Sequence, residues 1–453
     1  MSSRIQEIQA ALVGLPDSPE RADFLLELAG LYQNSDPSQA LVQAERAREL
    51  SRKLDHGIGL AAATRLKGAI HEQLGDYPRA VSCGMQALVL YREIGDQREA
   101  GRCLNNIGLA YTRMGALGAA LDHFQRALEI LAGDGDDQIR AYVINNIGLT
   151  YRSLDNHPRA MEHFQQSLDI LERLGDRRSI AHALSNIGLC HRTLGDGRQA
   201  MEHMRRSLAI RQEIGDRFSQ THSWINIANL HRDLGEHDQS YDCLMRAMDL
   251  AVEGGNTIME VYVMALLAKL KNVTGELDAA LDYIEHALPL AEKLGDQGVL
   301  RTLYQEYADN HEAGGRLGKA LEYRLRYFQG EVGLLSKNID GMEDRAAASG
   351  QPPADETGRI AAGIRRDQVA SLKLKFGNVR REFRQMLEHF AAVADKRPEP
   401  DQESCGDAGD EKWLERAIGH LPEPARPALR GMWADIRDIG NKVERLRQRS
   451  EQI

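Results

Sequence analysis

The stretch NNIGLAY, residues 105–111, indicates how the rest of the chain is organised. It returns forty residues later as NNIGLTY at 145–151, then as SNIGLCH at 185–191 and as INIANLH at 225–231. A motif that recurs at a fixed period indicates a repeat architecture, in which each copy is one small unit that stacks on its neighbours.

Two further positions keep the same spacing along most of the chain. One of them always holds a small residue: Gly68, Gly108, Gly148, Gly188, Ala228, Ala268 and Ala308. The other holds alanine or serine: Ala40, Ala80, Ala120, Ala160, Ala200, Ser240, Ala280 and Ala320. Because the register never slips, the repeat region is expected to be a regular stack of equal units.

One period, residues 97–136, contains two amphipathic segments joined by a turn at GALG. Apolar residues in both segments recur at steps of three and four, which predicts two helices per unit. At the seams, a glycine precedes an aspartate, as at Gly95 and Asp96, which predicts a C-capping glycine followed by an N-capping aspartate. Gly108 and Ala120 are expected to be small because helices of adjacent pairs approach closely there.

The composition also favours helices. The chain has 453 residues and a net charge of −10, and 42% of its residues are hydrophobic but only 5% aromatic. The sequence contains no run of alternating β-branched residues, so we expect almost no β-strand. The sequence shows no signal-peptide core and no stretch of about 20 apolar residues, so we expect a cytoplasmic protein that does not contact the membrane. Five scattered cysteines are typical of reduced thiols.

Each unit carries a small residue, Leu or Ala, and then Tyr on its first helix, followed by Ala, an aromatic residue and Ala on its second. This pattern resembles the tetratricopeptide repeat, and the forty-residue period is similar to that of LGN/Pins adaptors, kinesin light chains, Rap regulators and many bacterial signalling proteins. The resemblance implies an all-α fold, a right-handed α-solenoid of about eight helix pairs over residues 18–335, with a cap at 1–17. It also implies a protein-interaction scaffold, adaptor or regulator.

Beyond the repeats the sequence changes character. Residues 336–362 include a stretch rich in Ala, Gly and Pro and are expected to form a flexible linker. Residues 363–453 are expected to form a coiled-coil-like helical hairpin with an acidic loop at 396–411, because two heptad seams flank that loop. The seams consist of Val369, Leu372, Phe376, Val379, Phe383, Met386, Phe390 and Val393, and of Leu429, Met432, Ile436, Ile439, Val443 and Leu446.

A hairpin alone leaves apolar surface in water, at about 2 kcal/mol for each exposed phenylalanine. We therefore expect residues 365–450 either to pair with a second copy as a homodimer or to dock on the repeats. The candidate oligomerisation residues are Phe376, Val379, Phe383, Met386, Phe390, Ile436, Ile439 and Val443.

A search for catalytic or metal-binding motifs argues against an enzyme. The segment GGRLGKAL, 314–321, lacks the glycine and the hydroxyl residue that a phosphate-binding loop needs around its lysine. The histidine pairs 182/222 and 191/231 follow the repeat period, and His191 and His231 occupy the position of Tyr111, so we interpret them as packing residues. We expect no catalytic residues, no metal site and no cofactor.

The resemblance also assigns an inner, concave face to the first helix of each unit. With Gly108 as the eighth repeat position, the second, fifth, sixth, ninth, twelfth and thirteenth positions face that groove, while Ile107 points into the core. The groove residues are then Asn105, Asn145, Asn106, Asn146, Asn186, Asn226, Asn229, Arg113, Arg152, Arg192 and Arg232.

These residue types suit the binding of an extended peptide. An asparagine amide can donate to a peptide C=O and accept from its N–H, and arginine selects carboxylates or phosphates. We therefore expect a protein partner with an acidic or phosphorylated segment, bound over the units from 97 to 256. The inner positions of the last unit, Glu306, Asp309 and Glu312, are expected to repel that ligand.

Two alternatives remain open. The chain could be a Rap-like regulator of a phosphorylated signalling protein, although Rap proteins carry a helical bundle at the opposite end of their repeats. It could also bind nucleic acid through basic residues near its C-terminus, but interleaved Asp435, Asp438 and Glu444 and the net acidity argue against this. Those basic residues are Arg426, Arg430, Arg437, Lys442, Arg445, Arg447 and Arg449.

Overall fold

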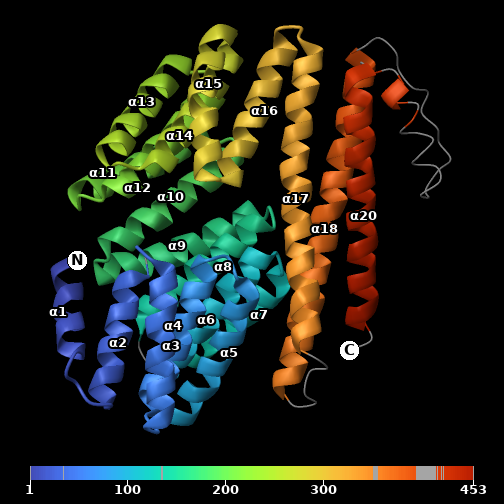
Figure 1. Cartoon of the computed structure of the whole chain (residues 1–453). Coiled ribbons are helices and arrows are strands. Elements are labelled where there is room, and N and C mark those ends of the chain that lie inside the picture. Colours follow the sequence, from blue (N-terminus) through green and yellow to red (C-terminus); the bar gives the residue numbers. More distant parts are fainter. Residues whose placement is uncertain are drawn as a thin grey trace. The chain divides into compact units, whose positions relative to one another are not determined.

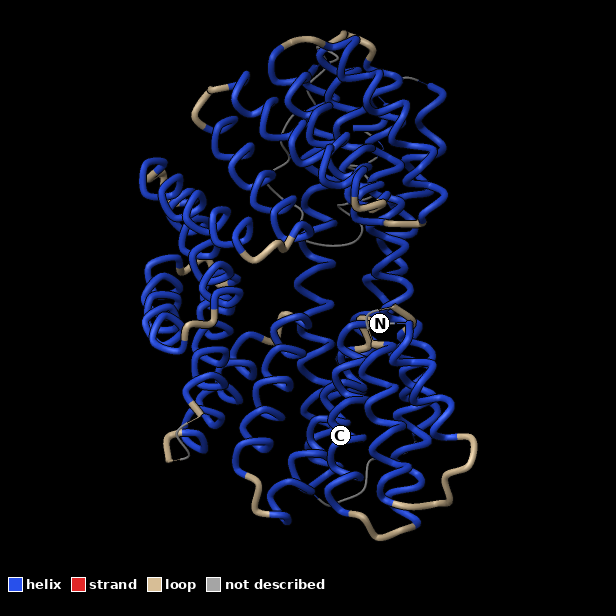
Figure 2. Tube along the Cα trace, turned by 90° about the vertical axis from the view of Figure 1, so that its left-hand side faces the viewer, coloured by secondary structure: helices blue, strands red, loops and turns tan. Residues whose placement is uncertain are grey.

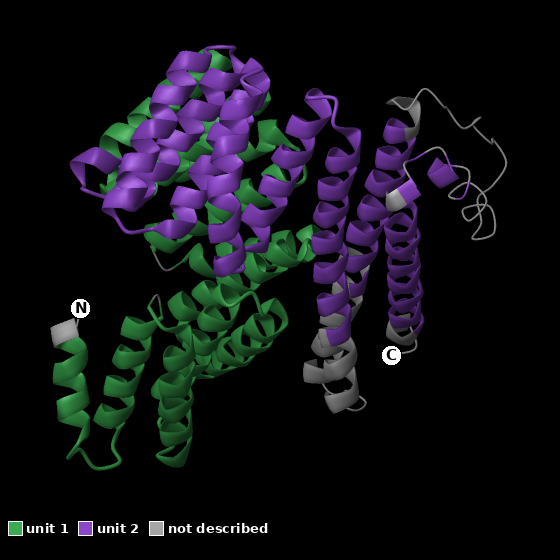
Figure 3. Ribbon diagram, turned by 45° about the horizontal axis from the view of Figure 1, so that its top comes forward, with its two compact units in different colours: residues 1–210 green, residues 211–453 purple. Residues whose placement is uncertain are grey.

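The structure is a computed structural model that describes residues 2–33, 35–133, 136–349, 356–393, 415, 417–419, 421 and 423–451. Within these ranges every regular element is a helix and no strand is present (Figure 1, Figure 2). Sixteen consecutive helices, α2 to α17, form eight pairs, which confirms the all-α repeat fold. The chain divides into two compact units, residues 1–210 and 211–453 (Figure 3).

The first unit contains five helix pairs after a short N-terminal helix, and the unit boundary falls in the last turn of α11. Its helices are α1 (Ser2–Leu12), α2 (Pro19–Tyr32), α3 (Pro37–Lys53), α4 (Gly57–Gln73), α5 (Tyr77–Ile94), α6 (Gln97–Met114), α7 (Leu117–Leu131), α8 (Asp137–Ser153), α9 (His157–Leu174), α10 (Arg177–Thr193) and α11 (Gly197–Glu213). The N-terminal helix α1 contacts α2 through the ion pair between Arg4 and Glu27.

The seams between pairs have the predicted caps. Gly95 ends α5 with a left-handed φ of 84°, a backbone conformation that favours glycine. Asp96 then accepts a hydrogen bond from the backbone N–H of Glu99 at 3.0 Å and starts α6. The same arrangement recurs at Gly175 and Asp176, so the repeat boundaries are set by local backbone chemistry.

The small residue at the eighth repeat position makes room for a side chain of the same pair. A methyl group on Gly108 would lie 2.5 Å from a ring carbon of Phe124 on α7, and one on Gly148 would lie 2.7 Å from Phe164 on α9. Phe124 and Phe164 are fully buried. The prediction that Gly108 serves contact between adjacent pairs is therefore wrong, because the close approach lies between the two helices of one pair.

The second unit continues the pairs and then adds two further long helices. Its elements are α12 (Arg217–Asp233), α13 (His237–Glu253), α14 (Thr257–Thr274), α15 (Leu277–Leu294), α16 (Gln297–Ala313), α17 (Leu317–Ser349), α18 (Glu356–Val393), the 3₁₀ turn η1 (Glu423–Ala425) and α20 (Arg426–Glu451). At 33 residues, α17 is much longer than any other repeat helix.

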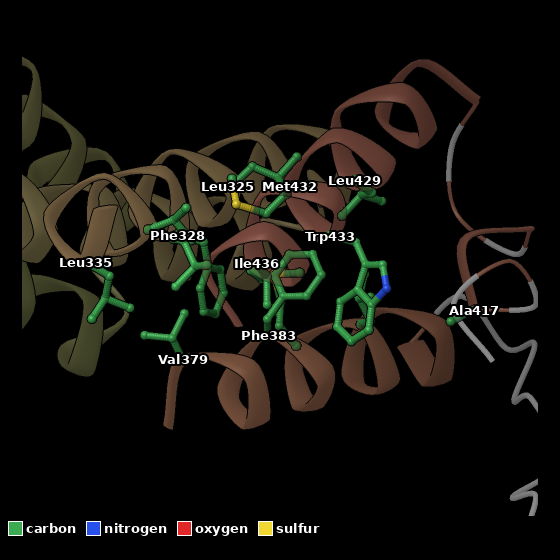
Figure 4. Close-up of a cluster of buried hydrophobic side chains, with 14 of the residues drawn as sticks. Leu325, Phe328, Leu335, Val379, Phe383, Ala417, Leu429, Met432, Trp433 and Ile436 are labelled. Carbon is green, nitrogen blue, oxygen red and sulfur yellow. The ribbon is translucent and has the colours of Figure 1, made fainter. Parts of the chain in front are cut away.

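Helices α17, α18 and α20 lie side by side (Figure 1) and share one hydrophobic core (Figure 4). Phe383 lies at its centre, fully buried, with its ring edge-on to Phe328 of α17 at 5.3 Å and stacked on Trp433 of α20 at 6.2 Å. Gly440 lets α20 approach α18, because a methyl group there would lie 2.8 Å from Phe376. The two seams read from the sequence are thus two sides of a three-helix core.

The third side of that core is a seam on α17 that the sequence analysis did not identify. It alternates steps of four and three like the other two and consists of Leu321, Leu325, Phe328, Val332, Leu335 and Ile339, all buried. Periodicity alone could have identified it, since the stripe runs without interruption from the last repeat into the expected linker.

Two expectations for this region change as a result. The candidate oligomerisation residues, apart from the partly buried Phe376, are buried inside a single chain, where both seams pack against the last repeat helix α17. The expected linker at 336–362 is helical up to Ser349, where α17 ends, and again from Glu356, where α18 begins. On α17 the apolar stripe continues into the expected linker through the buried Ile339. The expected acidic loop at 396–411 lies outside the described residues.

Candidate functional site

The asparagines of the recurring motif line one face of the first unit. Asn106, Asn146 and Asn186 lie on α6, α8 and α10 and are each half-buried. The isoleucine that follows each of them is buried in the core. Successive residues of a helix are turned by about 100°, so one residue can face outward while its neighbour packs inside.

Hydrogen bonds join Asn146 and Asn186 to asparagines of the preceding repeat, Asn105 and Asn145. Asn146 Nδ2 donates to Asn105 Oδ1 at 2.8 Å, and Asn186 Nδ2 donates to Asn145 Oδ1 at 3.4 Å. Asn105 was expected to face the groove, but it is only 8% exposed. It instead accepts the hydrogen bond that holds Asn146 in position. We call Asn106, Asn146 and Asn186, with the supporting Asn105 and Asn145, the asparagine ladder.

The asparagine ladder keeps capacity for a ligand. An asparagine amide offers two hydrogens and two oxygen lone pairs. Within the described chain, Asn146 uses one hydrogen of its side-chain amide, so one hydrogen and both lone pairs remain. The bonds along the ladder hold the amides in place, which reduces the entropy that is lost when a ligand binds.

Arg152 on α8 is the distinctive charge of this face. Its Nη1 donates to Asn186 Oδ1 at 3.0 Å, but it has no carboxylate partner among the residues that the structure describes. The side chain is half-buried, and this burial lowers the pKa of the guanidinium. A partly desolvated cation without a counter-charge is unfavourable on its own and is stabilised by an anion.

The other arginines predicted for the groove are in different environments. Arg113 is exposed and lies 3.7 Å from Glu72. Arg232, in the second unit, donates to Asn229 at 2.7 Å and pairs with Asp233 at 3.1 Å. Arg192 and Asn226 are half-buried on α10 and α12. Arg152 therefore differs from Arg113 and Arg232, which each pair with a carboxylate.

The second unit repeats the geometry of this site with the opposite charge. Asn272 and Glu306 stand at the repeat positions of Arg152 and Asn186, and Asn272 Nδ2 donates to Glu306 Oε2 at 3.2 Å. Glu306 is only 3% exposed, and burial raises the pKa of its carboxyl group. Glu306 therefore belongs to a buried network and does not face a groove as predicted.

That network includes an asparagine that the sequence analysis missed. Asn310 on α16 is fully buried and donates to Asn272 Oδ1 at 2.9 Å and to the carbonyl of Leu277 at 2.7 Å. The repeat pattern held no signal for it, because Asn310 stands two residues after the small position, where Ala110 and Thr150 lie in earlier copies.

The remaining candidates find structural explanations. The ring of His191 stacks on that of His203 at 5.5 Å, and Nδ1 of His231 contacts Glu236, so both act locally. In the described part of the chain, no three His, Cys, Asp or Glu residues gather as a metal site. Near the C-terminus, Arg430 pairs with Glu415 and Lys442 with Asp340, so part of the basic set is neutralised.

No described helix combines the length and the apolar character that crossing a bilayer requires.

Comparisons with known proteins agree with this architecture. Among proteins of curated function, none matches the sequence. Similar solved structures include the quorum sensor NprR from B. thuringiensis, at 17% identity, covering 73% of this chain and 98% of NprR with a TM-score of 0.54. Aspartyl phosphate phosphatase F from Bacillus subtilis is 16% identical, with 72% and 93% coverage and a TM-score of 0.52. At these identities the likeness concerns the fold alone.

The family assignment comes from the sequence. The tetratricopeptide repeat model matches residues 59–132, 137–213 and 219–293, and these ranges coincide with the helix pairs from α4 to α15. The chain therefore belongs to the tetratricopeptide repeat family, as the resemblance predicted.

Proposed function

We propose that this protein is a non-enzymatic regulator or adaptor that binds an extended acidic or phosphorylated segment of a partner protein along α6, α8 and α10. The observation that carries the proposal is Arg152, a half-buried guanidinium without a carboxylate partner in the described chain, held in place by Asn186. A carboxylate or phosphate from a ligand would supply the missing anion through charge-assisted hydrogen bonds.

The asparagine ladder supplies the second part of the recognition. Its side chains lie in a row on three successive first helices, and the spare donor and acceptors of Asn146 match the C=O and N–H groups of an extended backbone. Such contacts do not depend on the ligand's side chains. The ladder would therefore hold many sequences, while Arg152 selects those with an anion at one position.

Similar structures support a regulatory role for this fold. NprR is a quorum sensor, and a Rap protein that is 15% identical, with a TM-score of 0.50, was solved in complex with Competence and Sporulation Factor. That alignment covers 72% of this chain and 90% of the Rap protein. We extend to this chain only the general role of a repeat protein that responds to a partner.

The test uses fluorescein-labelled nonapeptides in which glutamate, phosphoserine or glutamine alternates with alanine. We expect the glutamate and phosphoserine peptides to bind and the glutamine peptide to bind far more weakly in fluorescence anisotropy titrations. Arg152→Gln should weaken binding of the acidic peptides tenfold or more, since a hydrogen bond to a charged group contributes about 1.5–3 kcal/mol. Asn146→Ala combined with Asn186→Ala should weaken all peptides alike.

Arg113→Gln is the matched control, because it removes the same charge from an exposed arginine that already has Glu72 as a partner. If Arg113→Gln and Arg152→Gln reduce affinity equally, binding depends on overall charge and the proposed site is wrong. The phosphoserine peptide should be recovered intact after incubation with the protein. Release of inorganic phosphate would contradict the non-enzymatic role.

A further inference from the structure

A separate pocket of about 860 Å³ lies within the second unit, between α16, α17 and α18. Its volume falls within the range of about 300–1,000 Å³ that is typical of ligand sites. It exists because α18 packs against α17 and thereby adds a wall beside the last repeat. No residue of the asparagine ladder lines it.

The lining combines aromatic surface with negative charge. Tyr327 is partly exposed and supplies the accessible ring, while Phe328 and Phe390, each 3% exposed, line the pocket from the hydrophobic core. Asp309, Glu312 and Glu382 supply three carboxylates, against which stand one guanidinium, Arg324, and the imidazole of His389. Aromatic faces and carboxylates together are the environment that a planar organic cation prefers, because both attract its charge while the rings stack on it.

The basic side chains of the lining are already engaged. Arg324 forms an ion pair with Asp309, and His389 Nε2 lies 2.5 Å from Glu312 Oε1. The nearby Arg301 pairs with Glu331 at 2.7 Å. Glu382 reaches the pocket from α18 and attracts Arg301 at longer range, but it forms no direct ion pair or hydrogen bond among the described residues. One carboxylate of the pocket therefore lacks a direct hydrogen-bond partner in the described chain and can accept one from a ligand.

The electrostatic environment of Asp309 also favours a cationic ligand over an anionic one. Although it pairs with Arg324, burial raises the pKa of its carboxyl group, with Glu312 as a further contributor. Arg324 and Lys269 offset part of this effect, and a further cation near Asp309 and Glu312 would relieve the repulsion between the two carboxylates. An anionic ligand would add to it.

We propose that this pocket binds an arginine side chain, with an adjoining apolar residue, from a peptide segment of a protein partner. Arginine fits better than lysine, because its planar group stacks on rings and donates to two carboxylates at once. The volume exceeds one side chain, which favours a peptide over a free amino acid. The proposal stands without the one made for the first unit, because the two share no residue.

The test uses the full-length protein and a labelled pentapeptide of glycine, arginine, leucine, arginine and glycine. Its counterparts carry lysine, or citrulline, which has the shape of arginine without the charge. We expect the arginine peptide to bind, the citrulline peptide to bind about tenfold more weakly or worse, and the lysine peptide to fall between them. Equal affinity for arginine and citrulline peptides would overturn the proposal, as would free arginine competing at the peptide's own concentration.

Variants then locate the binding. Glu382→Gln should weaken the arginine peptide about fivefold, in line with loss of one charge-assisted contact. Glu388→Gln, on the same helix but outside the lining, changes the net charge equally and should leave affinity within about twofold. Both glutamates are exposed, so the fold should persist, and equal circular dichroism melting curves will verify this. Equal losses in the two variants would overturn the proposal.

Arg152→Gln separates the two proposals. It should leave the arginine peptide unaffected while it weakens the acidic peptides.

Discussion

In the first unit, Arg152 donates a hydrogen bond across the repeat boundary to Asn186, whereas in the second unit Asn272, at the same repeat position, donates to Glu306. The two bonds are similar in length, 3.0 and 3.2 Å. The charge differs: the first pair carries a cation that lacks an anion within the described chain, and the second carries a buried carboxylate. One backbone geometry therefore supports a half-buried pair that includes a cation in one unit and a pair that includes a buried carboxylate in the other.

The surroundings of each pair explain this difference. Asn186 and Arg152 are half-buried, so both keep part of their surface in solvent. Glu306 is buried, and its network extends to Asn310, with Lys269 at 3.8 Å as its nearest cation. The repeat register thus fixes the position of a side chain on its helix, while neighbouring residues decide its burial and its hydrogen-bond partners.

The largest effect is expected from transplanting the second pair into the first unit. Arg152→Asn combined with Asn186→Glu replaces a cation by an anion in the asparagine ladder. Affinity for the acidic nonapeptide should fall about a hundredfold, because an attraction is lost and a repulsion is added. Anisotropy titrations at two salt concentrations measure this. If the acidic peptide still binds within about threefold of the unmodified protein, the two pairs do not differ in the proposed way.

A smaller effect, on stability, is expected from removing Asn272, a half-buried asparagine that forms hydrogen bonds with the buried Glu306 and Asn310. Asn272→Ala should lower the unfolding free energy by about 2 kcal/mol, because Glu306 and Asn310 lose hydrogen-bond partners in the core. Asn146→Ala removes one bond on a half-exposed face and should lower it by less than about 1 kcal/mol. Urea unfolding followed by circular dichroism compares them, and equal midpoints for the two variants would remove the distinction.

The smallest effect is expected at Glu306 and depends on pH. Burial raises the pKa of this carboxyl group in the folded state. Its contribution to stability is therefore complete below the unfolded-state pKa, about 4.3, and is lost as the pH rises through the folded-state value. Glu306→Gln does not titrate there, so it should be more stable at pH 7 by about 1 kcal/mol.

The advantage of Glu306→Gln should disappear as the pH falls toward 4. Thermal unfolding between pH 4 and 8 gives the comparison, with Glu388→Gln as a control on an exposed site of the same unit. A difference that stays constant over this range would mean that burial of the Glu306 carboxylate has no net effect on stability.

Much of the fold could be predicted from the sequence because its signals are local. Steps of three and four between apolar residues define each helix, and pairs such as Gly95 and Asp96 end one helix and start the next through bonds that span only a few residues. The forty-residue period then repeats these signals, so that the register of Asn146 and Ile147 follows from counting. The seam on α17 carried an equally local signal, but the Ala-, Gly- and Pro-rich stretch that follows it led to the prediction of a linker.

The states of the candidate site residues could not be predicted in this way. Arg113 and Arg152 look alike in sequence, yet only Arg113 reaches a carboxylate, because Glu72 lies on a neighbouring repeat. Glu306 has the sequence environment of an exposed helix residue and is buried by side chains from other segments. Ion pairing and desolvation depend on atoms far apart in the chain, so the repeat period determined the positions, and the packing of distant segments decided charge, burial and the pocket beside α18.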